Sequence, residues 1–147
     1  ASVMTILRTL GCKSRKDTLK RRLGTTRRHG THPERIKGLF REMDLSFREK
    51  HRASLCDLEN KVKKQKLCLV VYQAWGTKKY YDKMESGHYS VVFGVEKDYL
   101  WLADPYVRQK RTKYGKGIRK IRKEVFEGRW KDVDRKGVLY DHWMLAV

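Results

Sequence analysis

The chain has 147 residues, a length that suits one domain, and 39% of them are apolar, including four Trp, eight Tyr and four Phe. That content is enough for a packed core, and it argues against a disordered chain. No run approaches the roughly 20 apolar residues of a membrane-spanning helix, and the first residues lack the pattern of a signal peptide. Thirty-six Lys and Arg against 17 Asp and Glu give a formal charge of +19, which indicates either a solvated basic surface or a surface that binds polyanions.

The first predicted helix begins at the start of the chain. Val3, Ile6, Leu7 and Leu10 recur at the spacing of one helical face. A helix start leaves backbone N–H groups that a Ser, Thr, Asp or Asn just upstream usually caps. No such residue precedes Ala1 in the sequence, so we expect the chain to be truncated at its amino terminus.

Three further helices are expected in the first half of the chain, each marked by a cap or a closing glycine. The expected elements are a helix over Asp17–Leu23 closed by Gly24, a helix entered through the capping box of Thr31 and Glu34 with Pro33 in its first turn, a short strand over residues 45–50, and a helix capped by Ser54 and Asp57.

Strands replace helices in the second half. The segment Val107–Lys123 contains nine Lys or Arg among 17 residues, no acid, and two glycines, so we expect an exposed flexible loop there. Helices followed by a mostly antiparallel sheet give an α+β order, and we predict a single domain over residues 1–147. The other expected elements are strands over Leu67–Trp75, His88–Val95, Tyr99–Ala103 and Val138–Val147 and a short helix over Lys123–Gly128.

The informative stretch is Gly87–Pro105, which places a His at the start of one strand and an Asp at the end of its hairpin partner. With the turn centred near Lys97, His88 would lie opposite Tyr106. Asp104 would then be its diagonal neighbour on the same face, about 7 to 8 Å away at the backbone. A carboxylate on one imidazole nitrogen leaves the other nitrogen to deprotonate a nucleophile. His88 and Asp104 are therefore candidates for a general base and its orienting residue, the alternative being that they merely cap strand ends.

This stretch resembles the His and Asp segments of the bacteriocin-processing peptidases, family thirty-nine of the cysteine class. These papain-like enzymes remove double-glycine leader peptides. The shared pattern is Gly-His-Tyr, an apolar run ending in Gly, a polar turn, a short aromatic strand and Asp-Pro. The resemblance spans nearly the whole chain, and its other segments are Ala1–Gly11, Gly30–Glu34, Leu67–Gly76, Phe126–Trp130 and His142–Trp143.

The resemblance implies a papain-like fold and a Cys-His-Asp mechanism whose nucleophile precedes Ala1. It also implies an oxyanion-stabilising Gln further upstream, so the chain alone is expected to be inactive. The cysteines in the sequence are poor substitutes, because Cys12 falls roughly 15 Å or more from the start of the first helix, Cys56 opens the fourth helix, and Cys68 lies in an apolar strand. Their odd number and the absence of CxxC spacing argue against a disulfide set or a zinc site, and favour a reducing compartment such as the cytoplasm.

Two residues near the pair are candidates for lining a cleft: Gln73, at the end of the central strand, and Gly87. His142, beside Trp143, is expected to pack within the last strand, the alternative being that it faces the site. The other histidines lack ligand spacing, so we expect no metal and no cofactor. Three of them are predicted to be solvated surface residues: His29, His32 and His51.

The charge leaves a second function open. A non-catalytic basic module on a peptidase-like fold could contact nucleic acid or an acidic partner, and a peptidase could use the same segment to recruit an acidic substrate besides its peptide or protein substrate. No nucleic-acid motif accompanies the charge, which favours the solvated surface. The candidate contacts are Arg108, Lys110, Arg111, Lys113, Lys116, Arg119 and Lys120.

Overall fold

The computed structural model of the chain describes residues 1–26, 30–105, 107 and 111–147. Its centre is a six-stranded antiparallel sheet with the strand order β1-β10-β2-β3-β4-β7, accompanied by the two-stranded hairpins β5–β6 and β8–β9. The strands are β1 (Arg48–Lys50), β2 (Cys68–Gln73), β3 (Gly87–Val95), β4 (Tyr99–Ala103), β5 (Arg111–Thr112), β6 (Gly115–Lys116), β7 (Ile118–Arg122), β8 (Lys131–Val133), β9 (Leu139–Asp141) and β10 (Met144–Ala146).

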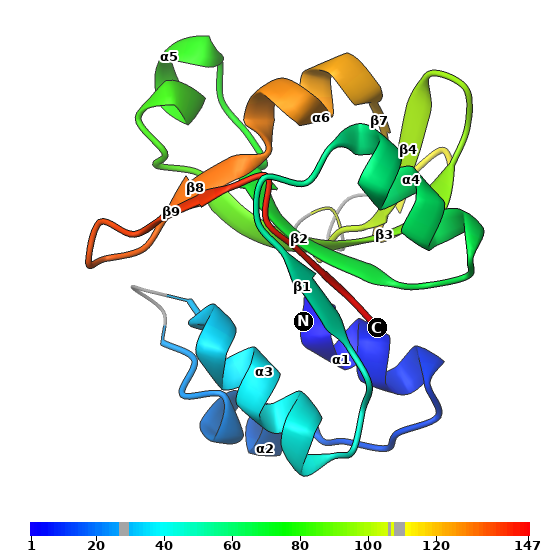
Figure 1. Cartoon of the computed structure of the whole chain (residues 1–147), viewed down its shortest axis with the longest axis vertical. Coiled ribbons are helices and arrows are strands. Elements are labelled where there is room, and N and C mark those ends of the chain that lie inside the picture. Colours follow the sequence, from blue (N-terminus) through cyan, green and yellow to red (C-terminus); the bar gives the residue numbers. More distant parts are fainter. Residues whose placement is uncertain (27–29, 106, 108–110) are drawn as a thin grey trace.

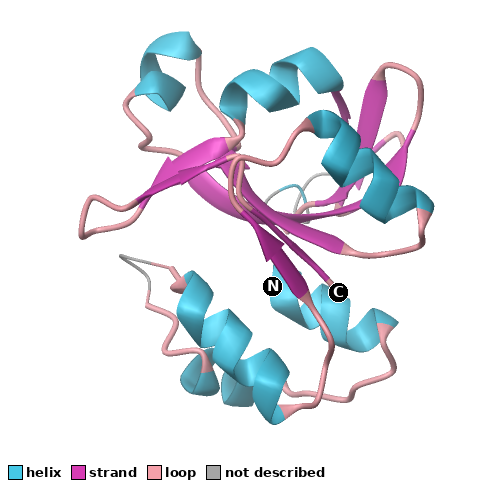
Figure 2. Cartoon of the chain, viewed as in Figure 1, coloured by secondary structure: helices cyan, strands magenta, loops and turns pink. Residues whose placement is uncertain are grey.

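Helices cover both faces of this sheet. Figures 1 and 2 show α1, α2 and α3 below the sheet and α4 and α6 above it. No helix among the described residues combines the length and the apolar character needed to cross a bilayer. The helices are α1 (Ser2–Thr9), α2 (Lys16–Arg22), α3 (Pro33–Glu42), α4 (Leu55–Lys63), α5 (Lys78–Asp82) and α6 (Lys123–Arg129). The predicted α+β class with a mostly antiparallel sheet is confirmed.

The strand β2 separates two cores. Side chains alternate across a strand, so Leu69 and Val71 join the core that includes α1, α2 and α3, whereas Val70 and Tyr72 join the core that includes α4 and α6. All six residues of β2 are buried. This two-sided burial explains why the sequence of β2 is a continuous apolar run without polar alternation.

The four helices predicted in the first half are present, and the capping box of α4 is confirmed. The predicted cap of α3 is wrong by one residue. His32 occupies the cap position, and its ring Nδ1 accepts a hydrogen bond from the backbone N–H of Glu34 at 3.3 Å. Pro33 is the first helical residue, so the residue immediately before it takes the cap, and Thr31 instead hydrogen-bonds to Thr25 at 2.6 Å.

The second half departs from the prediction in four places. The short elements α5 and β8 were not expected. The segment 107–123 is not a loop throughout, because β7 pairs with β4 along its whole length and buries Ile121. The last strand, expected over residues 138–147, is divided into β9 and β10 because His142 adopts a positive φ of 47°.

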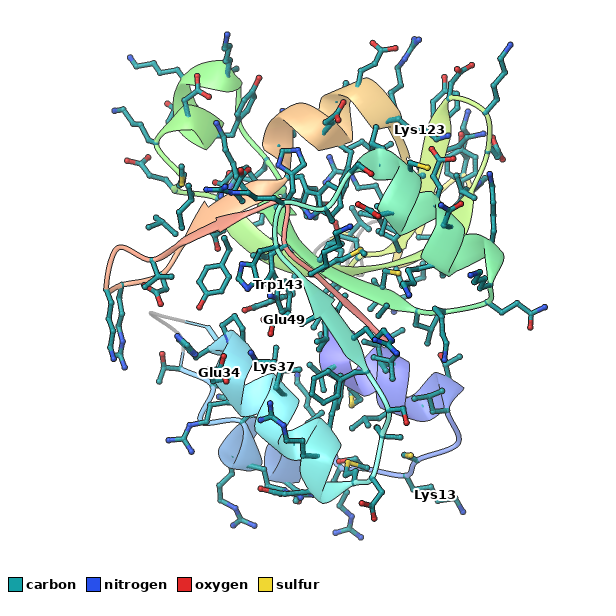
Figure 3. The ribbon with its side chains drawn as sticks, viewed as in Figure 1. Lys13, Glu34, Lys37, Glu49, Lys123 and Trp143 are labelled. Atoms are coloured by element: carbon teal, nitrogen blue, oxygen red, sulfur yellow. The ribbon has the colours of Figure 1, made fainter. Side chains whose placement is uncertain are left out.

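A partly buried ion cluster links the helical layer to the sheet, as Figure 3 shows. The Lys37 ammonium, on α3, contacts the Glu49 carboxylate, on β1, at 2.7 Å and also pairs with Glu34. Glu49 in turn accepts a hydrogen bond from the indole N–H of Trp143 at 2.8 Å. Burial acts to lower the pKa of Lys37, but its two carboxylate partners outweigh burial and raise it; burial acts to raise the pKa of Glu49, but Lys37 and Trp143 lower it.

We expect Lys37→Met to lower the free energy of unfolding by about 2 kcal/mol at pH 7, because it leaves the partly buried Glu49 carboxylate without its ammonium partner. Urea denaturation measures this loss. Lys13→Met, which removes an exposed cation from a loop, is the matched control and should change stability by less than about 0.5 kcal/mol. Equal effects of the two substitutions would contradict the role given to Lys37.

Candidate active site

The β3–β4 hairpin brings His88 and Asp104 together. Its register pairs Val91 with Ala103 and Val92 with Leu102, which is the register expected for a turn centred near residue 97. Nearer the turn, the register shifts at a bulge between Val92 and Gly94. Tyr106, expected opposite His88, lies outside the described residues.

The two side chains form a short contact at the end of this hairpin. The ring Nε2 of His88 lies 2.8 Å from Oδ1 of Asp104. The Asp104 side chain is fully buried, whereas 19% of the His88 side chain is exposed. A carboxylate accepts hydrogen bonds, so it favours the imidazole tautomer with its proton on Nε2. That tautomer carries its lone pair on Nδ1, the nitrogen that would act as the base.

Two residues that no local sequence pattern links to the pair surround the other oxygen of Asp104. The phenol of Tyr72, on β2, donates to Oδ2 of Asp104 at 2.8 Å. The guanidinium of Arg119, on β7, lies 3.6 Å from the same oxygen. Burial raises the pKa of the Tyr72 phenol, which keeps it a proton donor. The carboxylate therefore has partners from three strands of the same sheet, β2, β3 and β7.

The segment that follows β2 carries an aromatic wall beside His88. The indole ring of Trp75 lies 5.7 Å from the imidazole ring, centroid to centroid, and Trp75 is 40% exposed. The backbone around it is held by side chains, since Ser86 Oγ donates to the Trp75 carbonyl at 2.9 Å and Arg129 donates to the Gly76 carbonyl at 2.7 Å. The imidazole is thus bounded by a carboxylate at one nitrogen and by an indole against its ring.

The structure corrects the cleft-lining prediction for Gln73. Its side chain is completely buried, and both ends of its amide have partners. The oxygen accepts from the backbone N–H of Ser86 and lies 3.0 Å from the Ser86 hydroxyl oxygen, and the nitrogen donates to the Lys131 carbonyl and to Oδ1 of Asp132. Gln73 therefore joins β2 to β8 and does not face an open cleft. A glutamine at the end of an apolar strand fits this bridging role as well as a cleft position, so the sequence could not separate the two.

Gly87 is exposed at the start of β3, and its lack of a side chain has a local cause. A Cβ atom at this position would collide with the carboxylate of Asp132. Burial raises the pKa of that carboxyl to about 6, while Gln73 and the Val133 N–H act to lower it. Asp132 was not anticipated, because β8 has only three residues and no apolar pattern to mark it.

The first helix starts beside the pair. The hydroxyl of Ser2 donates to the backbone carbonyl of Tyr89, the neighbour of His88, at 2.6 Å. A cavity of about 330 Å³ opens between α1, which contributes Met4 and Arg8, and the wall formed by Asp104 and Lys116. The amino-terminal turn of α1 and Asp104 therefore line the same cavity.

The three cysteines lie away from His88 and Asp104. Cys12 follows the far end of α1, and Cys56 is exposed on α4. Cys68 pairs with Val92, four residues along β3 from His88, and burial raises the pKa of its thiol to about 12. A thiol that remains protonated at neutral pH is a poor nucleophile.

The other four histidines are not part of the His88–Asp104 contact. The ring of His142 packs against the indole of Trp130, with the ring centroids 5.0 Å apart, but His142 lies between β9 and β10 and not within a strand as expected. His51 is exposed and stacks on Tyr140. His32 is not merely solvated, because it caps α3 and pairs with Asp134 at 3.2 Å. His29 lies outside the described residues.

Two of the proposed polyanion contacts are already engaged within the molecule. Arg119 faces Asp104, and the Lys120 ammonium pairs with Glu96 at 2.7 Å. Both should therefore be removed from the predicted cationic surface. Lys113 and Lys116 are exposed. Arg108 and Lys110 lie outside the described residues, as does the side chain of Arg111.

Comparison with known proteins gives a family match and a fold match. Residues 1–133 match the family model described as the Peptidase C39 family. No curated protein matches the sequence. The fold is similar to the crystal structure of the peptidase domain of Streptococcus ComA, a bi-functional ABC transporter involved in a quorum-sensing pathway. The TM-score is 0.63 at 17% sequence identity, and the alignment covers 99% of this chain and 85% of that one.

We expect Asp132→Asn to stabilise the protein at pH 7.5 by about 1 to 2 kcal/mol. The folded-state pKa of about 6 lies above the ordinary value of 3.8, so the native state holds this proton more tightly than the unfolded chain. The stability that Asp132 contributes is therefore greatest below about pH 4 and falls as the pH rises through 6. Asparagine is neutral at every pH and retains an oxygen that can accept from Gln73.

Urea denaturation at pH 7.5 and pH 5 tests this expectation. The stability gap between Asp132→Asn and the unsubstituted chain should narrow at the lower pH. Asp98→Asn, at an exposed turn position, is the control and should show no such gap. Destabilisation by Asp132→Asn at pH 7.5 would refute the account of this carboxyl.

Proposed function

The chain belongs to the Peptidase C39 family and is a cysteine peptidase domain, and we propose that His88 is its general base and Asp104 the residue that orients that base. The observation that carries the proposal is the 2.8 Å contact between the His88 ring and a completely buried carboxylate. It supplies the two elements that a thiol nucleophile requires from its surroundings, a basic nitrogen and a fixed ring.

In the proposed reaction, Nδ1 of His88 takes the proton of a cysteine thiol. The thiolate then attacks the peptide carbonyl carbon to form a tetrahedral intermediate, and the imidazolium returns the proton to the leaving amine. An acyl-enzyme thioester remains. Water, deprotonated by the same imidazole, attacks this thioester, and the thiol is regenerated as the carboxylic acid product leaves. Asp104 stabilises the imidazolium during both steps through its hydrogen bond to Nε2.

The nucleophile is proposed to lie just before α1 in a longer chain. The contact between Ser2 and the Tyr89 carbonyl supports this, because it sets the start of α1 next to the residue that follows His88. The positions of Cys12, Cys56 and Cys68 also support it, since none of the three is at the hairpin end that carries the pair. By this proposal the 147 residues alone do not turn over.

The substrate is proposed to be a peptide with a leader that ends in two glycines. The support for this is the resemblance of Gly87–Pro105 and of the other segments to the leader-processing peptidases. Glycine before the scissile bond would also allow the peptide backbone to approach Trp75 and His88 closely, because it has no side chain to displace them.

The proposal is tested with a protein whose sequence extends before Ala1, beginning with inspection of the coding sequence. A Gln and a Cys-Gly-Pro within about a dozen residues of Ala1 are expected. In that protein, a peptide probe bearing a thiol-reactive group should label the upstream Cys. His88→Ala and Asp104→Asn should each slow labelling at neutral pH by at least about 100-fold.

His51→Ala is the matched control, since His51 is exposed, follows β1 and pairs with Glu49 on that strand, and its labelling should be unchanged. Undiminished labelling of His88→Ala would exclude His88 from the mechanism. For the substrate, the extended protein should cleave after Gly-Gly but not after Leu-Leu in an otherwise identical peptide. Equal cleavage of the two would contradict the leader assignment while leaving the peptidase assignment intact.

A further inference from the structure

A network of hydrogen bonds connects Arg119 to the candidate catalytic pair. A single guanidinium nitrogen, Nη1, donates to the Tyr72 hydroxyl at 3.0 Å and lies 3.6 Å from Oδ2 of Asp104. The Tyr72 hydroxyl in turn donates a hydrogen bond to that oxygen at 2.8 Å. The chain of contacts therefore runs from Arg119 through Tyr72 and Asp104 to the ring of His88.

The same nitrogen of Arg119 also reaches the other wall of the site. It donates to the backbone carbonyl of Ala74 at 2.9 Å, and the next residue, Trp75, lies against the imidazole. The guanidinium itself stacks over the Tyr72 ring, with its carbon 5.7 Å from the ring centroid. One side chain thus contacts both the support of the carboxylate and the backbone that carries the indole.

Arg119 also affects the charge balance of the site, because it and Asp104 are largely shielded from water. The Asp104 side chain is fully buried, and the Arg119 side chain is only 26% exposed. A buried carboxylate is unfavourable unless a cation or several donors balance it. When His88 is neutral, Arg119 is a nearby positive charge for Asp104. When His88 is protonated, the carboxylate is shared between two cations, which limits how strongly it stabilises the imidazolium.

We propose that Arg119 is a positioning residue of this site, which balances the charge of Asp104 and fixes the carboxylate and the Trp75 wall on two sides of His88. The inference rests on the proposed function of the pair. It assigns to β7, the strand at the edge of the sheet, a part in the site that its basic sequence does not suggest.

The test follows the protonation of the His88 ring by NMR in the 147-residue chain, with the signal assigned through His88→Gln. Arg119→Met keeps an unbranched stem and removes the charge. It should move the midpoint of the His88 titration to higher pH by about 0.5 to 1 unit, because the imidazolium no longer competes with the guanidinium for Asp104. The close contacts between the Trp75 and His88 rings should also weaken, because the Ala74 carbonyl loses its donor.

Arg122→Met is the matched control, because it removes the same charge from the same strand at a more exposed position beside Glu124. Its shift should be no more than about 0.2 unit, as expected for a screened surface charge. Arg119→Lys keeps the charge but not the fork of donors, so the midpoint should stay within about 0.3 unit of the unsubstituted chain while the Trp75–His88 contacts still weaken.

Equal shifts for Arg119→Met and Arg122→Met, or ring contacts unchanged in both Arg119 variants, would overturn the proposal. If Arg119→Met does not fold, Arg119→Gln is compared with Arg122→Gln by the same criteria. A failure of the extended protein to react with the thiol probe would instead remove the proposed function, and it would leave the NMR comparison unaffected. The two failures are therefore distinguishable.

Discussion

The buried carboxylate of Asp104 is the constraint on which the site depends. A charge that is removed from water must find compensation within the protein, and Asp104 finds it in side chains from three strands: Tyr72 on β2, His88 on β3 and Arg119 on β7. The sheet order β2-β3-β4-β7 places β2 next to β3, and β3 and β7 on either side of β4, which leads into Asp104. The strand order of the sheet thus brings together the side chains that balance the charge of Asp104.

The two helical layers serve this sheet in different ways. The helices α1, α2 and α3 pack on one face, and α1 reaches the backbone beside His88 through Ser2. The helices α4 and α6 pack on the other face, where the ring centroids of Tyr72 and Phe126 lie 5.6 Å apart. The ion cluster of Lys37 and Glu49 ties the first layer to β1. The start of α1 is therefore held against the sheet at the point where a nucleophile is proposed.

The sequence was sufficient to predict the parts of the site that are close together in the chain. His88 and Asp104 are 16 positions apart and belong to one hairpin, so alternation and a polar turn were enough to bring them together. Tyr72 and Asp104 are 32 positions apart, and Tyr72 and Arg119 are 47 apart. No local pattern joins such residues, because their contact depends on the order of strands across the sheet.

The elements that were missed share a physical cause. In β7, Ile118 and Ile121 are surrounded by cations, and the partners that make those cations compatible with a strand, Glu96 for Lys120 and Asp104 for Arg119, lie on other segments. In the last strand, the positive φ of His142 breaks the pairing although the residues on both sides favour strands. Local propensity was overridden in both places by contacts that form only in the folded protein.

The most direct measurement is the tautomer of the neutral His88 ring, which long-range proton–nitrogen NMR correlation reads in the 147-residue chain without any nucleophile. We expect the proton to reside on Nε2, facing Asp104, with Nδ1 unprotonated, and Asp104→Ala to remove this preference. A neutral ring with its proton on Nδ1, or the same tautomer mixture with and without Asp104, would contradict the assignment of His88 as the base and Asp104 as its orienting residue.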